Sequence, residues 1–188
     1  GANVIDIGMA STPMVYYATA FTKADAGVQI TASHNPAAYN GCKFCREDAI
    51  PVAYDTGLEA METLVKAGTL KPAAKAGTVE TRDIGPEYRK KLLTFAAPGM
   101  APLKIAIDAG NGVMGAFLPA LLEKLPVRAT PLFFEPDGSF PNHEANPLKE
   151  ENMRDLRAKV LETRADLGIA YDGDGDRSMF MDETGGII

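Results

Sequence analysis

Three carboxylates at alternate positions are the residues of this sequence with the clearest capacity for chemistry. They are Asp172, Asp174 and Asp176, separated by glycines and followed by Arg177. Aspartate and glycine are poor strand formers, and like charges this close together repel one another. A divalent cation would remove the repulsion, because oxygen ligands suit Mg²⁺, Mn²⁺ and Ca²⁺. The spacing therefore favours a metal-binding loop over the alternative, a solvated acidic turn.

A second polar loop carries Ser33, His34 and Asn35 between an apolar run and Pro36. A hydroxyl at the mouth of a strand, beside an imidazole, can act as a nucleophile or carry a phosphoryl group. The alternative is a turn in which Ser33 and Asn35 cap backbone groups. A Ser-His-Asp hydrolase is disfavoured, because the sequence has no G-x-S-x-G motif and an adjacent His rarely reaches its neighbour's hydroxyl.

The functional interpretation of each loop is stronger when the two loops are considered together. A metal held by three aspartates keeps open positions that suit a phosphate oxygen. With Lys43 and Arg177 nearby, such an ion would neutralise charge on a transferring phosphoryl group. The loops lie far apart in the sequence, so their meeting is a prediction about the tertiary structure.

Short apolar runs alternate with helical patterns along the chain, which predicts an α/β fold. The acidic loop follows an apolar run at 165–171, so it leaves the C-terminal end of a strand, where α/β proteins place their sites. Strands are expected at 4–7, 27–31, 42–46, 103–107, 128–134, 167–171 and 179–181, and helices at 12–21, 56–67, 86–97, 113–125 and 151–164.

Local signals add detail to these elements. Thr12 is expected to cap the first helix, with Pro13 in its first turn. The second helix is expected to bury Leu58, Met61, Leu64 and Val65. Segment 66–78 has no hydrophobic period and reads as a surface connection. The Pro- and Gly-containing segment 97–102 is the best linker candidate, which divides the chain into domains at 1–98 and 103–188.

Composition narrows the classes of function. The chain has 188 residues, 46% of them hydrophobic and 23% charged, as in ordinary globular proteins. A net charge of -6 argues against a nucleic-acid partner. No apolar run is long enough to span a membrane and no signal peptide is present, so a soluble, cytoplasmic protein is expected. The chain opens inside an expected strand without Met and ends as another begins, which suggests a piece of a larger protein.

Cys42 and Cys45 have C-x₂-C spacing, which invites a redox or zinc interpretation. They fall on an expected strand, where residues three apart face opposite sides. No second pair of Cys or His is available to complete a zinc site. The two cysteines are therefore expected to be structural or incidental.

Taken together, these motifs resemble those of the α-D-phosphohexomutases. The resemblance is carried by Thr31-Ala32-Ser33-His34-Asn35-Pro36, by Tyr39-Asn40-Gly41-Cys42-Lys43-Phe44 and by segment 172–177, and it covers essentially the whole chain. Tyr39-Asn40-Gly41 is more similar to the bacterial phosphomannomutase/phosphoglucomutase branch than to phosphoglucosamine mutases, which tend to carry an acidic residue at the position of Tyr39.

The resemblance implies an isomerase of carbohydrate metabolism that interconverts 1-phospho and 6-phospho forms of glucose and/or mannose. It implies two similar βα modules with mixed sheets sandwiched by helices, as the first two of four domains. By the same resemblance, Ser33 carries the phosphoryl group and donates it to the sugar phosphate, which gives a bisphosphorylated intermediate. Mg²⁺, with Mn²⁺ as a substitute, is bound by Asp172, Asp174, Asp176 and an oxygen of Ser33. Hexose 1,6-bisphosphate acts as activator.

Three further residues receive roles from the resemblance. Lys43 aids proton transfer to or from the sugar hydroxyl, His34 is a neighbour in the serine loop, and Arg177 stabilises the phosphoryl group. A lysine with a lowered pKa can act as a general base, and a guanidinium suits phosphate geometry.

The resemblance also implies that parts of the enzyme are missing from this chain. The family's N-terminal arginine loop, the sugar-recognition loop of its third domain and the phosphate-binding loop of its fourth domain have no counterpart here. The expected partners are a hexose phosphate and the missing C-terminal domains, with neither nucleic acid nor membrane. Little or no mutase turnover is expected from this chain alone.

Three other interpretations compete. Gly110, Gly112 and Gly115 fit G-x-G-x-x-G after an expected strand, with Glu135 further on, which is the context of a dinucleotide site. A haloacid-dehalogenase-like phosphatase would instead use Asp172 as nucleophile. A calcium loop would take its ligands from the three aspartates and Glu183, although Arg177 stands where the sharp turn requires Gly.

Overall fold

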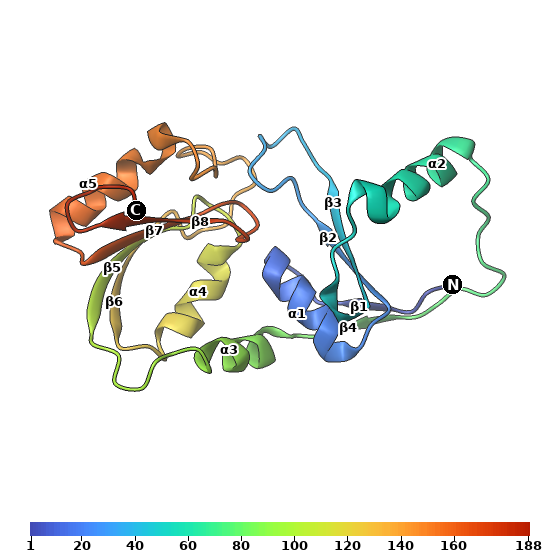
Figure 1. The fold of residues 1–188 in the computed structure, drawn as a ribbon, viewed down its shortest axis with the longest axis horizontal. Coiled ribbons are helices and arrows are strands. Elements are labelled where there is room, and N and C mark those ends of the chain that lie inside the picture. The colour runs from blue at the N-terminus through green and yellow to red at the C-terminus, as the bar shows by residue number, and fades with distance from the viewer.

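The computed structural model describes residues 1–188 and consists of two lobes that lie side by side (Figure 1). The first lobe (residues 1–81) holds strands β1 to β4, and the second lobe (residues 103–188) holds β5 to β8. Helix α3, Gly85–Leu93, runs below the junction of the lobes in the view of Figure 1. The α/β class expected from the sequence is confirmed. No helix combines the length and the apolar character needed to cross a membrane.

The second lobe is built on a mixed four-stranded sheet of order β6-β5-β7-β8. Strand β5 is parallel to both β6 and β7, whereas β8 returns antiparallel to β7 after the acidic loop. The strands are β5 Leu103–Asp108, β6 Val127–Leu132, β7 Leu167–Tyr171 and β8 Ser178–Asp182. The carboxyl ends of the three parallel strands therefore meet at one edge of the sheet, where the acidic loop begins.

Helices cover both faces of this sheet, as the alternation of side chains along β5 shows. Ile105 and Ile107 pack in a cluster with α4, Met114–Leu122, whereas Ala106 packs in a cluster with α5, Arg154–Thr163. Successive strand residues point to opposite faces, so one strand contributes to both layers. A short 3₁₀ segment, Glu150–Met153, leads into α5.

The first lobe holds two separate two-stranded sheets. Strands β1, Val4–Asp6, and β4, Val79–Thr81, are parallel, whereas β2, Ala26–Ile30, and β3, Cys42–Arg46, are antiparallel. Strand β4 was not expected from the sequence. A cavity of about 360 Å³ lies between β1 and β2 and reaches Gly173 and Asp174. Both cysteines of β3 are free, and Cys42 is exposed whereas Cys45 is buried, as expected for residues three apart on a strand.

Helix α1, Thr12–Thr22, is capped by Ser11 and not by Thr12 as expected. The Ser11 side chain accepts a hydrogen bond from the Met14 amide at 3.4 Å, and Pro13 lies in the first turn. Ser11 has extended backbone geometry, which suits an N-cap, so the helix begins one residue earlier than a cap at Thr12 would place it. This leaves the Thr12 hydroxyl available for another partner.

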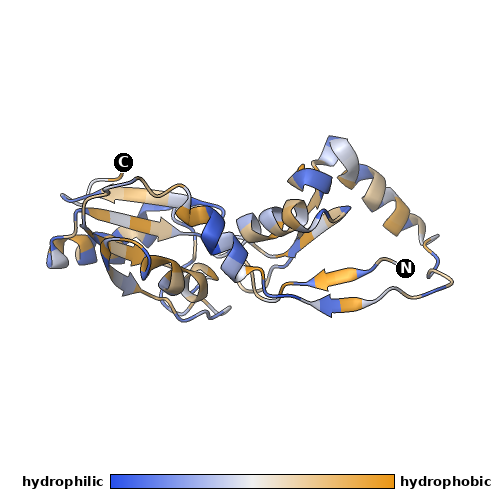
Figure 2. Ribbon diagram, turned by 90° about the horizontal axis from the view of Figure 1, so that it is seen from below, coloured by the Kyte–Doolittle hydropathy of each residue, from blue (hydrophilic) through white to orange (hydrophobic).

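Helix α2, Glu59–Ala67, does not bury the apolar residues expected of it. A π-helical turn, Tyr54–Leu58, precedes it and is its main packing partner. Met61, Leu64 and Val65 are 39%, 51% and 67% exposed, because the helix projects from the edge of the first lobe (Figure 1). Figure 2 shows hydrophobic residues on α2 and on the β1–β4 pair. The sequence pattern identified the helix, but no sheet covers its apolar face.

One hydrophobic core joins the two lobes. It combines first-lobe residues such as Met14 and Val15 with second-lobe residues such as Ile107 and Phe117. Ile84, just before α3, is fully buried within it. Tyr88 of α3 contacts an aromatic ring on each side, Tyr17 and Phe117, at centroid distances of 5.2 and 5.3 Å. The lobes are therefore positioned by shared apolar packing as well as by polar contacts.

Replacing Ile84 with Ala should lower the free energy of unfolding of both lobes by about 2–5 kcal/mol, because the cavity opens in their common core. Urea unfolding followed by circular dichroism measures this change. As a control, Leu64→Ala on exposed α2 should change stability by less than about 0.5 kcal/mol. Two separated transitions in the wild-type chain would contradict a shared core.

The connection between β6 and the 3₁₀ segment, here called the crossover loop (residues 133–149), is tied to β5 through a histidine. His143 Nε2 lies 2.9 Å from Asp108 Oδ2, and its Nδ1 lies 2.9 Å from the carbonyl oxygen of Glu144. Both ring nitrogens face acceptors, which suits the imidazolium form. The hydrogen bond to buried Asp108 raises the pKa of His143, although burial opposes it.

The raised pKa of His143 makes part of the stability pH-dependent. Its contribution should be fully present below the ordinary histidine pKa of about 6.5 and lost as pH rises through the higher folded value. We therefore expect His143→Gln to destabilise the chain more at about pH 5.5 than at about pH 9. Urea unfolding of both proteins at the two pH values measures the difference. An equal loss at both would show that the pair is not charged in the folded state.

Candidate phosphoryl-transfer site

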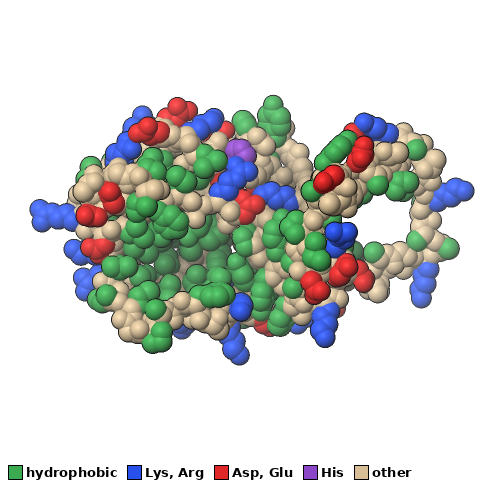
Figure 3. Space-filling model, in the orientation of Figure 1, with side chains coloured by type: hydrophobic (Ala, Val, Ile, Leu, Met, Phe, Trp, Pro, Cys, Tyr) green, Lys and Arg blue, Asp and Glu red, His purple; other side chains and the backbone are tan.

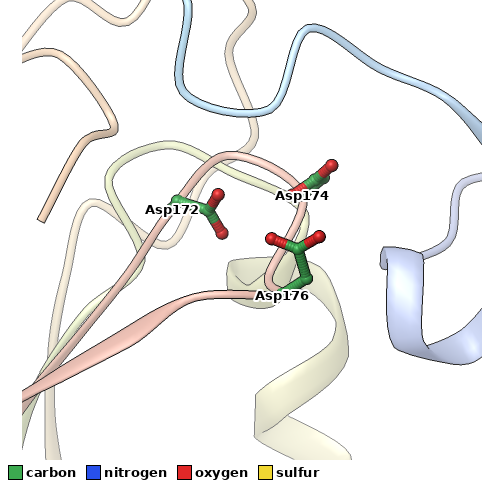
Figure 4. Close-up of side chains that lie close together, drawn as sticks. All are labelled: Asp172, Asp174 and Asp176. Carbon is green, nitrogen blue, oxygen red and sulfur yellow. The ribbon is translucent and has the colours of Figure 1, made fainter. Parts of the chain in front are cut away.

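The three aspartates lie on the tight loop between β7 and β8. Gly175 adopts a left-handed conformation (φ 71°), and the loop closes with hydrogen bonds of 3.1 Å from Asp172 N to Arg177 O and from Gly175 N to Asp172 O. One oxygen of each carboxylate lies within 4.8 Å of the others (Figure 4). Asp172 and Asp174 are buried and Asp176 is exposed.

Ser33 from the first lobe lies directly against this loop. Its Oγ donates a hydrogen bond of 2.9 Å to Asp172 Oδ2, across 139 positions of sequence. Ser33 adopts a left-handed conformation (φ 54°), and its amide donates to Thr31 Oγ1 at 2.7 Å. A non-glycine residue in this conformation is strained, and such strain is concentrated at functional sites. The strained turn after β2 thus presents the hydroxyl to the second lobe.

Asp174 receives three hydrogen bonds from the first lobe on a single oxygen. Its Oδ2 accepts from Thr12 Oγ1 and Thr31 Oγ1, both at 2.9 Å, and from Lys43 Nζ at 2.7 Å. Its other oxygen, Oδ1, is buried without any partner. A buried carboxylate oxygen without a partner is costly unless something absent from the protein chain binds it.

Lys43 lies between two of the aspartates. Its ammonium contacts Asp174 and also Asp176, so it occupies the centre of negative charge. Burial lowers the pKa of Lys43, but its hydrogen bonds to these carboxylates outweigh burial and raise the pKa overall. The structure therefore does not place a lysine of lowered pKa here, and a protonated Lys43 is a proton donor in this environment.

His34 and Arg177 complete the group of expected residues. His34 Nδ1 lies 3.3 Å from Ser33 Oγ and 2.7 Å from Arg177 Nη1. A guanidinium only donates, so Nδ1 must act as the acceptor and its lone pair faces Arg177. Arg177 also lies 3.9 Å from an oxygen of Asp172 and of Asp176. All seven side chains expected at the site are thus brought together where the lobes meet, and Figure 3 shows basic, acidic and histidine side chains gathered there.

The electrostatics of the two buried aspartates differ. Burial raises the pKa of Asp172, and nearby Asp174 adds to this, more than the hydrogen bonds from Arg177 and Ser33 lower it. For Asp174, burial also raises the pKa, but the hydrogen bonds from Lys43 and Thr12 outweigh it and lower the pKa. Two cations, the ammonium of Lys43 and the more distant guanidinium of Arg177, therefore do not fully balance three carboxylates.

These residues fit a divalent cation. Hard carboxylate oxygens are the ligands that Mg²⁺ and Mn²⁺ prefer, and the unpartnered Oδ1 of Asp174 offers a buried ligand position. An added cation would also relieve the repulsion that raises the pKa of Asp172. A calcium loop of the helix–loop–helix type is ruled out, because strands flank the loop on both sides.

The glycines of the supposed dinucleotide fingerprint serve packing within the protein. A Cβ on Gly115 would lie 1.9 Å from the carbonyl oxygen of Phe134, and one on Gly112 would lie 2.7 Å from that of Gly173. The two glycines therefore let the chain's own backbone approach closely, which a larger residue would prevent. The dinucleotide interpretation is not supported.

Two residues of the site were missed by sequence analysis, Thr12 and Thr31. Thr12 was assigned to a helix cap, and Thr31 to the end of a strand. Their hydroxyls meet at Asp174 only because the lobes fold against each other, over separations of 162 and 143 positions. No spacing along the chain signals such a contact.

Two family models match the chain. The phosphoglucomutase/phosphomannomutase alpha/beta/alpha domain I model matches residues 1–71, and the alpha/beta/alpha domain II model of the same family matches residues 86–185. Together they cover most of the chain.

Similar proteins carry related names. The chain is 45% identical over 190 residues to a protein named "Phosphohexose mutases" from Xanthomonas campestris pv. campestris, covering 100% of this chain and 42% of that protein. It is 43% identical over 192 residues to the phosphomannomutase/phosphoglucomutase of Pseudomonas aeruginosa, covering 100% and 40%. The chain thus spans about two fifths of the length of these curated relatives.

A solved structure supports the fold. The crystal structure of a phosphoglucomutase/phosphomannomutase family protein from Burkholderia thailandensis superimposes with a TM-score of 0.90 at 32% identity, covering 100% of this chain and 42% of that one. The expected fold of two α/β modules from this family is thereby confirmed.

Because Lys43 would compete with a cation for Asp174 and Asp176, Lys43→Met should tighten Mn²⁺ binding by about two- to fivefold, the range of a partly exposed ion pair. Electron paramagnetic resonance of free Mn²⁺ measures the dissociation constant. Lys66→Met is the matched control, because that ammonium pairs only with Glu62 on exposed α2. Weaker binding in Lys43→Met would show that the lysine organises the carboxylates instead of competing for them.

Proposed function

The chain belongs to the phosphoglucomutase/phosphomannomutase family, and on that premise we propose that it forms the phosphoryl-transfer centre of a hexose-phosphate mutase. The reaction moves a phosphoryl group between the 1 and 6 positions of glucose and/or mannose phosphate. Ser33 carries the group, and the sugar passes through a bisphosphorylated intermediate.

The observation that carries this proposal is the contact between Ser33 and Asp172. A hydroxyl from one lobe donates at 2.9 Å to a buried carboxylate of a three-aspartate loop on the other. A capping turn would not require this contact, because Ser33 would then bond to local backbone groups. A phosphoryl carrier needs its oxygen next to the charge-neutralising groups.

The residues of the site have distinct roles in the proposed transfer. The P–O bond to Ser33 Oγ breaks as a sugar hydroxyl oxygen forms a new bond to phosphorus. The sugar hydroxyl loses its proton and Ser33 Oγ takes one up, so that serine leaves as the free hydroxyl. Arg177 would hold phosphoryl oxygens, because a guanidinium matches their geometry. Lys43, protonated and beside Asp174, would donate a proton on the return transfer. His34, which contacts both Ser33 Oγ and Arg177, would hold the guanidinium near the serine.

A metal ion belongs to this proposal. Mg²⁺, with Mn²⁺ as substitute, would be held by Asp172, Asp174, Asp176 and an oxygen of Ser33, and would supply positive charge that neutralises the transferring phosphoryl group. The unpartnered Oδ1 of Asp174 supports this assignment. Hexose 1,6-bisphosphate is the proposed activator, because it can phosphorylate Ser33 directly.

The extent of the active enzyme is also part of the proposal. We take residues 1–98 and 103–188 as its first two domains and further domains of the same protein as the partners that complete the sugar site. The proposed site of action is the cytoplasm. Mutase turnover by the 188-residue chain alone should therefore be undetectable in a coupled assay, and robust turnover would contradict the need for those domains.

A phosphatase that uses Asp172 as nucleophile is not supported. Asp172 is fully buried, and its two oxygens accept hydrogen bonds from Ser33 Oγ and from the Arg177 amide at 3.0 Å. An oxygen so engaged is poorly placed to attack phosphorus.

The carrier role is tested by incubating the chain with glucose 1,6-bisphosphate and Mg²⁺ and locating phosphate by mass spectrometry. We expect one hydroxylamine-stable phosphoryl group on Ser33, complete loss of labelling in Ser33→Ala, and normal labelling in Ser139→Ala, whose hydroxyl lies in an exposed loop. Hydroxylamine-labile phosphate on Asp172 would favour the phosphatase. No labelling at an excess of bisphosphate would contradict the carrier role.

A further inference from the structure

Asn111 has no part in the proposed reaction. It lies between the crossover loop and the acidic loop (residues 172–177), which is the proposed metal-binding loop. It adopts a left-handed conformation (φ 57°) and is only 7% exposed. Its position in the turn after β5 places it one residue before Gly112. An asparagine tolerates this conformation, but burial of its amide requires specific partners.

The crossover loop supplies all of those partners. The Asn111 amide nitrogen donates to Phe133 O at 2.8 Å, and its carbonyl accepts from Asp137 N at 2.9 Å. Its side chain donates to Glu135 O at 2.8 Å and accepts from Asn142 Nδ2 at 2.8 Å. Four hydrogen bonds thus hold Asn111. The position of the crossover loop therefore determines the direction in which the backbone leaves Asn111.

The loop is itself anchored at its far end. His143, next to Asn142, binds buried Asp108 of β5, and Asp108 Oδ1 accepts from the Gly110 amide at 2.8 Å. The turn 108–112 is therefore held from both sides, by β5 and by the crossover loop.

The residues after Asn111 touch the metal-binding loop. Val113 N donates to the carbonyl oxygen of Gly173 at 3.1 Å. A Cβ on Gly112 would lie 2.7 Å from the same oxygen, and one on Gly173 would lie 2.4 Å from the carbonyl oxygen of Ser33. Gly173, between Asp172 and Asp174, is thus enclosed by the Gly112 turn on one side and the serine turn on the other.

From these contacts we propose that Asn111 is a positioning residue for the phosphoryl-transfer centre. Held by the crossover loop, it directs Gly112 and Val113 against Gly173 and so sets the place of the aspartates relative to Ser33. Asn142 acts with it through the side-chain hydrogen bond. This inference rests on the proposed function, because it treats the aspartates as metal ligands.

The substitution Asn111→Gly tests the proposal, because glycine accepts the left-handed backbone and removes only the side-chain hydrogen bonds. We expect it to raise the dissociation constant for Mn²⁺ about tenfold, the scale seen when an outer partner of a metal ligand is lost. Global unfolding by urea should stay cooperative, and the binding is measured on folded protein by electron paramagnetic resonance. A purely structural role for Asn111 would leave this affinity unchanged.

A second variant and a control make the result specific. Asn142→Ala, at an exposed position, should weaken Mn²⁺ binding about threefold. The double variant should bind Mn²⁺ no more weakly than Asn111→Gly alone, because both substitutions remove the same hydrogen bond between Asn111 and Asn142. Ser139→Ala lies in the same loop and bonds only to Asp137 Oδ1, so it should bind Mn²⁺ like the wild type.

Hydrogen exchange separates this inference from the proposed function. In Asn111→Gly, the amides of Val113 and Arg177 should exchange at least about tenfold faster, while those of β7 keep their protection. If the wild-type chain binds no Mn²⁺, the metal part of the proposed function fails, and the exchange rates alone decide the positioning role. Unchanged exchange at Val113 and Arg177, or Mn²⁺ affinity of Asn111→Gly within twofold of wild type, would overturn the proposal.

Discussion

The carboxylate of Asp174 is the interaction on which the site depends. One of its oxygens accepts hydrogen bonds from Thr12, Thr31 and Lys43, all in the first lobe, while the carboxylate belongs to the second. These donors lower its pKa against the effect of burial, so the group stays charged. A buried charge without such partners would be strongly destabilising. The lobes are thus joined at the point where the chemistry is proposed, and the second oxygen remains available to a cation.

Apolar packing makes this polar contact rigid. The core that contains Ile84, Met14 and Phe117 extends across both lobes, and α3 adds aromatic contacts on each side. Close-packed interiors resist small displacements. The distance between Ser33 and Asp172 is therefore set by the core beneath the site and not only by the hydrogen bond between them. Glycine serves the same end, because Gly173 lets the serine turn and the Gly112 turn approach from opposite sides.

Charge balance explains why the site suits a cation and a phosphoryl group together. Three carboxylates face Lys43 and Arg177, and Arg177 also contacts His34. In the protein alone, Lys43 takes the place of a metal ion among the carboxylates and its pKa is raised. A divalent cation would compete with Lys43 for Asp174 and Asp176, which would release the ammonium toward phosphate oxygens. The raised pKa of Lys43 depends on its hydrogen bonds to Asp174 and Asp176, contacts that no spacing in the sequence predicts.

The sequence by itself determined the α/β alternation, most element positions, and the two loops that carry Ser33 and the three aspartates, because each is a local pattern of period or spacing. It also determined that a chain of this composition forms a globular core. It left open whether the acidic loop binds metal and whether the serine loop is only a turn. The element ends shifted by a few residues, as with the cap at Ser11, because neighbouring side chains compete for the same backbone groups.

Only the tertiary structure decided how these parts combine. It brought Thr12 and Thr31 to Asp174, raised the pKa of Lys43, left the apolar face of α2 uncovered, and held Asn111 against the crossover loop. Each of these outcomes depends on contacts between groups more than 20 positions apart, or on the absence of an element that would cover a helix. Such long-range contacts and such absences produce no periodic pattern in the sequence. Local propensity selects the elements, whereas burial and long-range hydrogen bonds select their partners.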